Sequence, residues 1–166
     1  MADPTKLQIM KAMTASLESV SIASGFHNDL ADSVFRGRNV FGDSDPLPMV
    51  SILEAPVPID KVMTPDGSQK DTGDWELLIQ GFSKDDPDNP TDPAHLLMAD
   101  VKRVLVAEKS KGGGQFTTTG PFGLGKFIRK MYIGQGVVRP PEQYVSSKAY
   151  FWLGVRLNIV ENLASG

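Results

Sequence analysis

Apolar residues recur at helical spacing near the start of the chain. From Leu7 to Val20 they fall every three or four positions, which is the spacing of one face of an α-helix. Asp3-Pro4 has the composition of a helix start, because an acidic cap precedes a proline whose missing N–H costs nothing at the first helical position. Gly25 ends the run. The pattern predicts a helix that packs on a sheet.

Three segments then alternate between apolar and polar residues, as strands do. They run from Val34 to Phe41, from Met49 to Glu54 and from Trp75 to Phe82. Prolines stand on both sides of the second segment, where a residue without a ladder donor is tolerated. The third segment is apolar on much of both faces, so it is predicted to be the central strand.

The second half of the chain supplies another helix and further strands. Asp92-Pro93 marks the helix start, and the glycines at 112–114 mark its end. Strands are predicted from Phe127 to Ile133 and from Ala149 to Val160. The connection between these strands is irregular, and the sequence does not decide whether Val137-Val138 forms a short strand.

These elements give the order α-β-β-β-α-β-β. A meander followed by a helix and further strands is typical of an α+β fold, with a mainly antiparallel (mixed) sheet and two helices packed on one face. The length of 166 residues suits one domain, and no repeat or internal boundary is visible. We therefore expect a single domain over 1–166 with flexible loops at 60–73, 84–93 and 110–126.

The composition excludes several kinds of chemistry. Cysteine is absent and histidine occurs only at His27 and His95, so there is no disulfide framework, no thiolate site and little material for a metal centre or a triad. The net charge of −3 lacks the basic footprint that grips nucleic acid. No apolar run reaches transmembrane length and no signal-peptide pattern opens the chain, so cytosolic synthesis without membrane contact is expected.

The segment from Gly120 to Phe127 comes close to a phosphate-binding loop. It fits the pattern of Gly, four residues, Gly and Lys, but Phe127 stands where a Ser or Thr hydroxyl would hold magnesium. A strand-like segment follows, whereas phosphate binding uses the N-terminus of a helix. Nucleotide binding is therefore not expected, and no cofactor or metal is assigned.

Two further candidates have plainer explanations. The acidic segment 84–92 lacks the residue order of a calcium loop and is interrupted by prolines, so a solvated loop is favoured. His27 lies two residues from Asp29, a spacing that could orient a general base, but no nucleophile lies nearby in the sequence. His27 and His95 are interpreted as structural or surface residues, and no catalytic residue is assigned.

A pair of arginines is a candidate for subunit contact. Arg36 and Arg38 flank Gly37 on the first predicted strand, so both side chains are expected on the same face. Arginine binds carboxylates in bidentate geometry, and the pair could meet an acidic group of a neighbouring subunit. A solvated sheet face explains the same pattern equally well.

The glycine-rich arm over 110–126 carries the apolar side chains of Phe116, Phe122 and Leu124. Such a segment has little material to bury them locally, so it either folds over its own core or orders against a partner. We favour the partner. These three residues join the two arginines as the candidate residues of an oligomer or tail interface.

One long segment carries a family resemblance. From Val34 to Pro56 the chain contains Val-Phe-Arg-Gly-Arg-Asn-Val-Phe and then Leu-Pro-Met-Val-Ser-Ile-Leu-Glu-Ala-Pro, after the amphipathic helix that opens it. In that setting the chain resembles the tail terminator or tail-completion proteins of tailed bacteriophages, the gpU-like group. The late glycine-rich stretch and the aromatic strand Tyr150-Phe151-Trp152 are similar to that group as well. The loop over 60–73 is longer than in its shortest members.

The resemblance implies a small structural subunit of the virion that closes into a ring, often a hexamer. Such a ring caps the tail tube and presents the surface that the head joins, so its partners are its own copies, the tail tube protein and the head-completion or connector protein. DNA passes through without specific binding, which suits a mildly acidic subunit. The family has no catalytic residues. A head–tail adaptor or neck protein, another tail structural protein, a small hydrolytic enzyme and a monomeric binding domain remain as alternatives.

Overall fold

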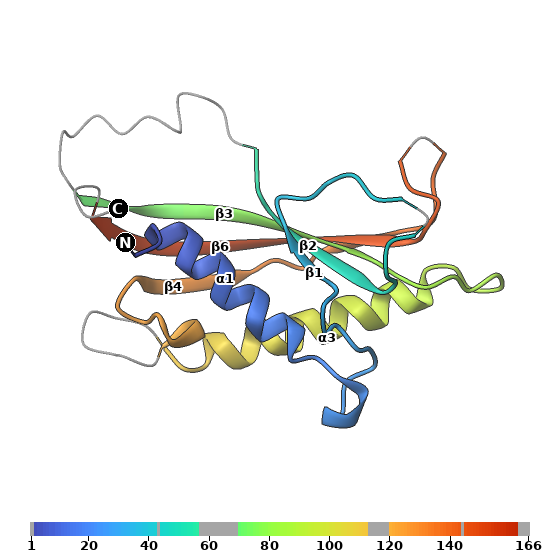
Figure 1. Cartoon of the computed structure of the whole chain (residues 1–166), viewed down its shortest axis with the longest axis horizontal. Coiled ribbons are helices and arrows are strands. Elements are labelled where there is room, and N and C mark those ends of the chain that lie inside the picture. Colours follow the sequence, from blue (N-terminus) through green and yellow to red (C-terminus); the bar gives the residue numbers. More distant parts are fainter. Residues whose placement is uncertain (1, 43, 57–69, 113–119, 144, 163–166) are drawn as a thin grey trace.

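The structure, a computed structural model, describes residues 2–42, 44–56, 70–112, 120–143 and 145–162 (Figure 1). In chain order the described elements are α1 (Thr5–Glu18), the 3-10 helix η1 (Ile22–Ser24), β1 (Val34–Arg36), β2 (Met49–Glu54), β3 (Lys70–Phe82), α3 (Asp92–Lys109), the 3-10 helix η2 (Pro121–Gly123), β4 (Ile128–Ile133), β5 (Val137–Arg139) and β6 (Tyr150–Asn162). The predicted α+β class is confirmed. The short strand at Val137-Val138, which the sequence left undecided, is present as β5.

The strands form one mixed sheet, six-stranded in the described part of the chain. Its order is β1-β2-β3-β6-β4, and β5 pairs with β6 beyond the end of β4. β1 and β2 run parallel, whereas the other pairs are antiparallel. β3, the segment predicted to be central, lies in the middle of this order.

β3 and β6 are the two long strands at the centre of the sheet. They pair along their whole length of 13 residues each. Leu77 and Ile79 of β3 are buried together with Leu153 and Val155 of β6, directly opposite them. Because side chains alternate across a strand, the residues between these four point to the other face of the sheet.

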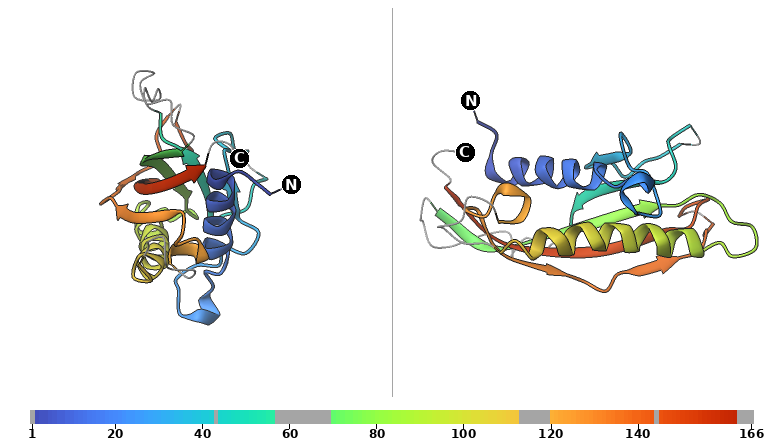
Figure 2. Two further views of the ribbon diagram at one scale, coloured as in Figure 1. Left: turned by 90° about the vertical axis from the view of Figure 1, so that its left-hand side faces the viewer. Right: turned by 90° about the horizontal axis from the view of Figure 1, so that it is seen from below.

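Both helices cover one face of the sheet, as the sequence predicted (Figure 2). α1 packs against β1, and α3 packs against β3, β4, β5 and β6. The core between the layers takes fully buried side chains from both helices, from β2 and from the two long strands: Ile9, Met13, Leu17, Leu97, Leu105, Ile52, Ile79, Phe151 and Leu153. In the described part of the chain, no helix covers the opposite face, which we call the open face.

α1 has the buried stripe that its sequence predicts, and Leu17 is fully buried. Its predicted start is wrong by one position. Pro4 and not Asp3 is the N-cap, and the Asp3 carboxylate instead forms an ion pair with Lys11 at 2.7 Å. The helix ends at Glu18, and Gly25 caps η1 with a positive φ of 88°.

Three other predicted boundaries change. The first strand ends at Arg36 and does not reach Phe41, because Gly37 takes a positive φ of 68° that breaks the extended backbone. The last residues of the loop predicted over 60–73 belong to β3, which begins at Lys70. The earlier part of this loop lies outside the described residues. The loop predicted over 84–93 ends sooner, because Asp92 already belongs to α3.

Candidate assembly interface

The two faces of the sheet differ in what they carry. Along β6, Phe151, Leu153 and Val155 point into the core, whereas Trp152, Gly154 and Arg156 point to the open face and are exposed. An antiparallel sheet with one solvated face normally carries polar residues there. Here the exposed side includes Trp152, whose side chain is 40% exposed at the centre of the sheet.

Five aromatic rings cross the open face in a row. Phe35 of β1 lies 6.3 Å from Phe41, and Phe41 lies 4.8 Å from Phe82 of β3, measured between ring centroids. Phe82 lies 6.2 Å from Tyr150 of β6, and Tyr150 lies 5.5 Å from Trp152. All four separations fall in the range where tilted aromatic pairs attract each other. The row therefore joins the edge of the sheet to its central strand.

Arg38 packs on the rings at the outer end of this aromatic row. Its guanidinium carbon lies 4.7 Å from the ring centroid of Phe35 and 5.0 Å from that of Phe41. Its guanidinium also pairs with the carboxylate of Asp45. The backbone N–H of Gly42, and after it the Arg38 guanidinium, hold the pKa of Asp45 below its ordinary value. These contacts hold residues 38–42 and Asp45 against the sheet.

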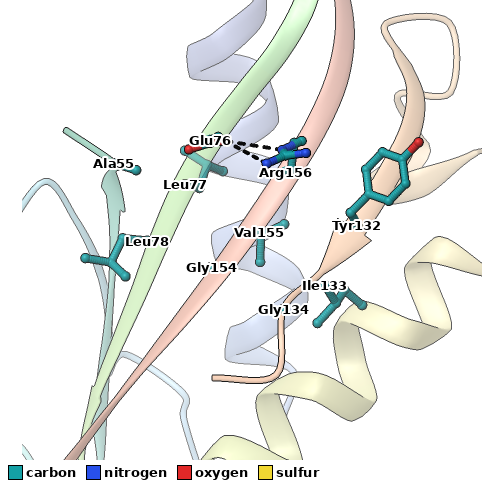
Figure 3. Close-up of a pocket in the computed structure, with 10 residues that line it drawn as sticks. All are labelled: Ala55, Glu76, Leu77, Leu78, Tyr132, Ile133, Gly134, Gly154, Val155 and Arg156. Carbon is teal, nitrogen blue, oxygen red and sulfur yellow. Dashed lines mark hydrogen bonds and ion pairs between the residues drawn. The ribbon is translucent and has the colours of Figure 1, made fainter. Parts of the chain in front are cut away.

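A groove of about 420 Å³ lies on the open face beside the inner end of the aromatic row (Figure 3). Its floor is Gly154 of β6, which pairs with Leu78 of β3. Tyr132 of β4 forms the opposite wall, and the ion pair between Glu76 and Arg156, 3.0 Å long, lies at one end. The other residues along it are Ala55, Leu77, Ile133, Gly134 and Val155. We call this cavity the Gly154 groove.

The Gly154 groove exists because a central strand has a glycine at this position. A Cβ built on Gly154 would meet no other atom within 4 Å, and its φ is not in the left-handed region. A larger residue would therefore fit without strain. Glycine in a strand interior weakens the strand, and it often marks a place where another backbone or a ligand approaches closely. Nothing in the described part of this chain fills the space.

The predicted arrangement of Arg36 and Arg38 is wrong. β1 ends at Arg36, so only this arginine lies on the strand, and its Nη1 donates a hydrogen bond to Thr14 Oγ1 of α1 at 3.0 Å. Arg38 lies beyond the turn at Gly37 and stacks on the aromatic row instead. The two side chains therefore point to opposite sides of the sheet, because the turn reverses the alternation on which the prediction relied.

The described end of the glycine-rich arm folds onto its own domain. Phe122 and Leu124 are partly buried against the core, and the N–H of Phe122 donates to Glu108 Oε2 at 2.7 Å. The preference for a partner was wrong for these two residues, because the turn of η2 places them beside α1 and α3. Phe116 lies outside the described residues.

The remaining sequence candidates are engaged in ordinary structural contacts. After Phe127 the chain enters β4 and not a helix, as the sequence predicted. Asp29 accepts a hydrogen bond from the N–H of Ile22 and does not orient His27. In the acidic segment, Asp85 pairs with Lys148 and Asp86 accepts backbone N–H groups. Among the described residues, no group of acidic and histidine side chains is placed to hold a metal ion.

Sequence reasoning missed the open face, although one signal for it was available. In the predicted strand over 149–160, Trp152, Gly154 and Arg156 share one face, and an aromatic beside a glycine is unusual for a solvated face. The walls of the groove come from Leu78 and Tyr132, which are far from Gly154 in sequence. Their approach depends on the pairing of β6 with β3 and β4.

Comparison with protein families and with curated proteins gives no match to this chain. Over the residues that the structure describes, no helix is long and apolar enough to cross a membrane. Function therefore has to be inferred from the chemistry of the open face, together with the sequence.

Proposed function

We propose that this protein is a structural subunit that closes with its own copies into a ring, as the tail terminator of a tailed bacteriophage. In this role the ring caps the tail tube and presents the surface to which the head binds. The protein would then be made in the host cytoplasm and end in the virion. The resemblance of residues 34–56 to the tail terminator group motivates the assignment to a tail.

The observation that carries the proposal is the open face of the sheet. It exposes Trp152, Tyr132 and Val137, each between 40% and 47%, and Tyr132 also lines the Gly154 groove. Aromatic residues are enriched at the centres of protein interfaces, and charged residues are depleted there. Large exposed apolar surfaces on soluble proteins mark places where another molecule binds. A groove of this character supports a binding role better than a catalytic one, because no nucleophile or paired acid lines it.

Ring closure also needs a particular kind of contact. A ring of identical subunits forms when two different surfaces of each subunit meet and the rotation closes. One aromatic surface facing its own copy would produce a dimer and stop there. The proposal therefore requires a second, complementary surface elsewhere on the subunit.

Negative-stain imaging and sedimentation velocity of the purified protein test the proposal directly. We expect a closed ring of one size, in equilibrium with smaller species as the protein is diluted. Purified tail tubes should then carry the ring at one end only, and a tube with a ring should grow no longer. A protein that stays monomeric at every concentration and in the presence of tail tubes would contradict the proposal. Binding to a connector but not to tail tubes would favour a head–tail adaptor.

A further inference from the structure

The helix α3 carries a second apolar stripe, which faces away from the core. Its inner stripe of Leu97, Val101 and Leu105 is fully buried. Leu96 and Val106 lie on the opposite side, and their side chains are 46% and 54% exposed. The exposed small residues Ala99, Ala107 and Ser110 lie between and beside them at helical spacing, and the exposed side chains of His95 and Arg103 share this side of the helix. A helix at the surface of a single domain normally carries charged residues on that side.

Arg103 is the long charged side chain within this outer stripe, and it is turned aside. Its Nη1 donates to the carbonyl oxygen of Gly25 at 2.8 Å, and its guanidinium carbon lies 4.4 Å from the ring centroid of Phe26. The guanidinium is therefore held over the segment that contains η1. The outer stripe of α3, defined by Leu96, Ala99, Val106 and Ala107, stays uncovered in the described part of the chain.

The outer stripe and the open face lie on opposite sides of the subunit. α3 packs on one face of the sheet (Figure 2). Its outer stripe is exposed on the side away from that face, whereas the Gly154 groove lies on the other face of the sheet. We infer that these are the two halves of one contact, in which the outer stripe of α3 packs into the Gly154 groove of the next copy. This inference rests on the proposed ring, and it names the two surfaces that would close it.

The dimensions of the two surfaces match. α3 has 18 residues, which at the rise of an α-helix makes it about 27 Å long. β6 has 13 residues, which at the rise of a strand makes it about 43 Å long. The helix therefore fits lengthwise on the open face. Ala99 and Ala107 allow its backbone to approach, and Gly154 removes the side chain that would hold it away.

The charges at the borders of the two surfaces are also complementary. The exposed carboxylate of Asp74 on β3 carries the uncompensated negative charge along one side of the open face, because the Glu76 carboxylate is already paired with Arg156. The exposed Lys109 lies beside the outer stripe on the last turn of α3. Placing this border of the helix against β3 brings opposite charges together at the rim, where they set orientation more than affinity. A second copy of this chain thus satisfies both the apolar and the charged part of the surface.

Gly154→Val tests the sheet side of the contact. The new side chain fills the groove but meets no atom within 4 Å at its Cβ, and valine favours strands more than glycine does. We expect a melting temperature equal to or above that of the wild type and a dissociation constant between subunits at least tenfold higher. A variant that is at least as stable as the wild type but associates more weakly shows that Gly154 lies at a contact between subunits and is not needed for folding. An unchanged dissociation constant would overturn the inference.

Leu96→Asp and Val106→Asp test the helix side. Both side chains are exposed, so the fold should survive, and each change should also raise the dissociation constant at least tenfold. Leu7→Asp on α1 is the matched control, because Leu7 is 37% exposed but lies on neither surface. The control should assemble as the wild type does. Equal loss in all three variants would point to a general effect of charge and would contradict the proposed contact.

Mixing two defective variants distinguishes this contact from a symmetric one. Gly154→Val keeps an intact outer stripe on α3, and Leu96→Asp keeps an intact Gly154 groove. In an equal mixture, the stripe of the first variant can therefore pack into the groove of the second, and dimers should form. Neither variant alone should do so. Suppose that the wild type forms rings and that Leu96→Asp alone forms them too. The open face then does not contact α3 of the next copy, so the inferred contact is wrong although the proposed ring is retained. A wild-type protein that forms no ring overturns both.

Discussion

Two glycines on the paired central strands show how differently the two faces of the sheet are built. Gly81 of β3 points to the covered face, and a Cβ placed there would overlap the ring of Phe151 from β6. Gly154 of β6 points to the open face, and a Cβ placed there would meet nothing within 4 Å. On the covered face the chain itself fills the space that a glycine leaves. On the open face, nothing in the described part of the chain fills the space that Gly154 leaves.

The largest effect should come from the covered side. Leu17→Asp replaces a fully buried leucine of α1 with an unpaired charge, which should lower the free energy of unfolding by more than about 4 kcal/mol. Urea denaturation followed by circular dichroism measures this loss. Leu7→Asp on the same helix is the control and should change stability little, because Leu7 is partly exposed. A similar small loss for both would mean that α1 does not pack on the sheet.

Gly81→Ala and Gly154→Ala test the difference between the two glycines. At Gly81 the added methyl group must displace the ring of Phe151, which is itself fully buried, so overpacking should lower the free energy of unfolding by about 3 kcal/mol. Gly154→Ala should leave it unchanged or raise it slightly. Thermal unfolding of the two variants side by side measures the difference. Equal destabilisation would show that the open face is packed as tightly as the core.

Trp152→Ala should separate the stability of the subunit from its assembly. Trp152 is 40% exposed and makes its aromatic contact with Tyr150, so folding should lose about 1 kcal/mol. If the open face is the subunit contact, a tryptophan at its centre should matter more for association, by about 2 kcal/mol. Sedimentation velocity and thermal unfolding on the same sample give both values. A loss confined to stability would place Trp152 outside the interface.

The smallest effect concerns the loop that Arg38 and Asp45 hold at the outer end of the aromatic row. The pKa of Asp45 is lowered in the folded protein, so its carboxylate stabilises the fold above the ordinary Asp pKa of about 3.9. That contribution disappears as the pH falls through the lowered folded pKa. Hydrogen exchange at residues 38–42 should therefore quicken in acid more in the wild type than in Asp45→Asn. The same acceleration in both would exclude Asp45 as the cause.

Much of the secondary structure follows from local patterns in the chain. The predicted bounds of β2 match the observed strand, and the stripes that include Leu17 and Leu97 predicted the buried sides of α1 and α3. The end of the first strand was missed because Gly37 was taken as part of an extended segment. A glycine is compatible with both extended and left-handed backbone, so its residue type does not decide between them. Arg38 was misplaced for the same reason.

The α+β class, the order of the elements and the central position of the strand that includes Trp75 could be predicted from the sequence alone, because helical and strand periods are local properties of the chain. The uncovered face of the sheet, in the described part of the chain, and the groove with Gly154 as its floor follow instead from how distant strands pair. Leu78 and Tyr132 reach this glycine through the pairing of β6 with β3 and β4. The ion pair at the end of the groove joins Glu76 and Arg156, which lie 80 positions apart in the sequence. A space of this kind belongs to no single segment, and the pairing of distant strands creates it.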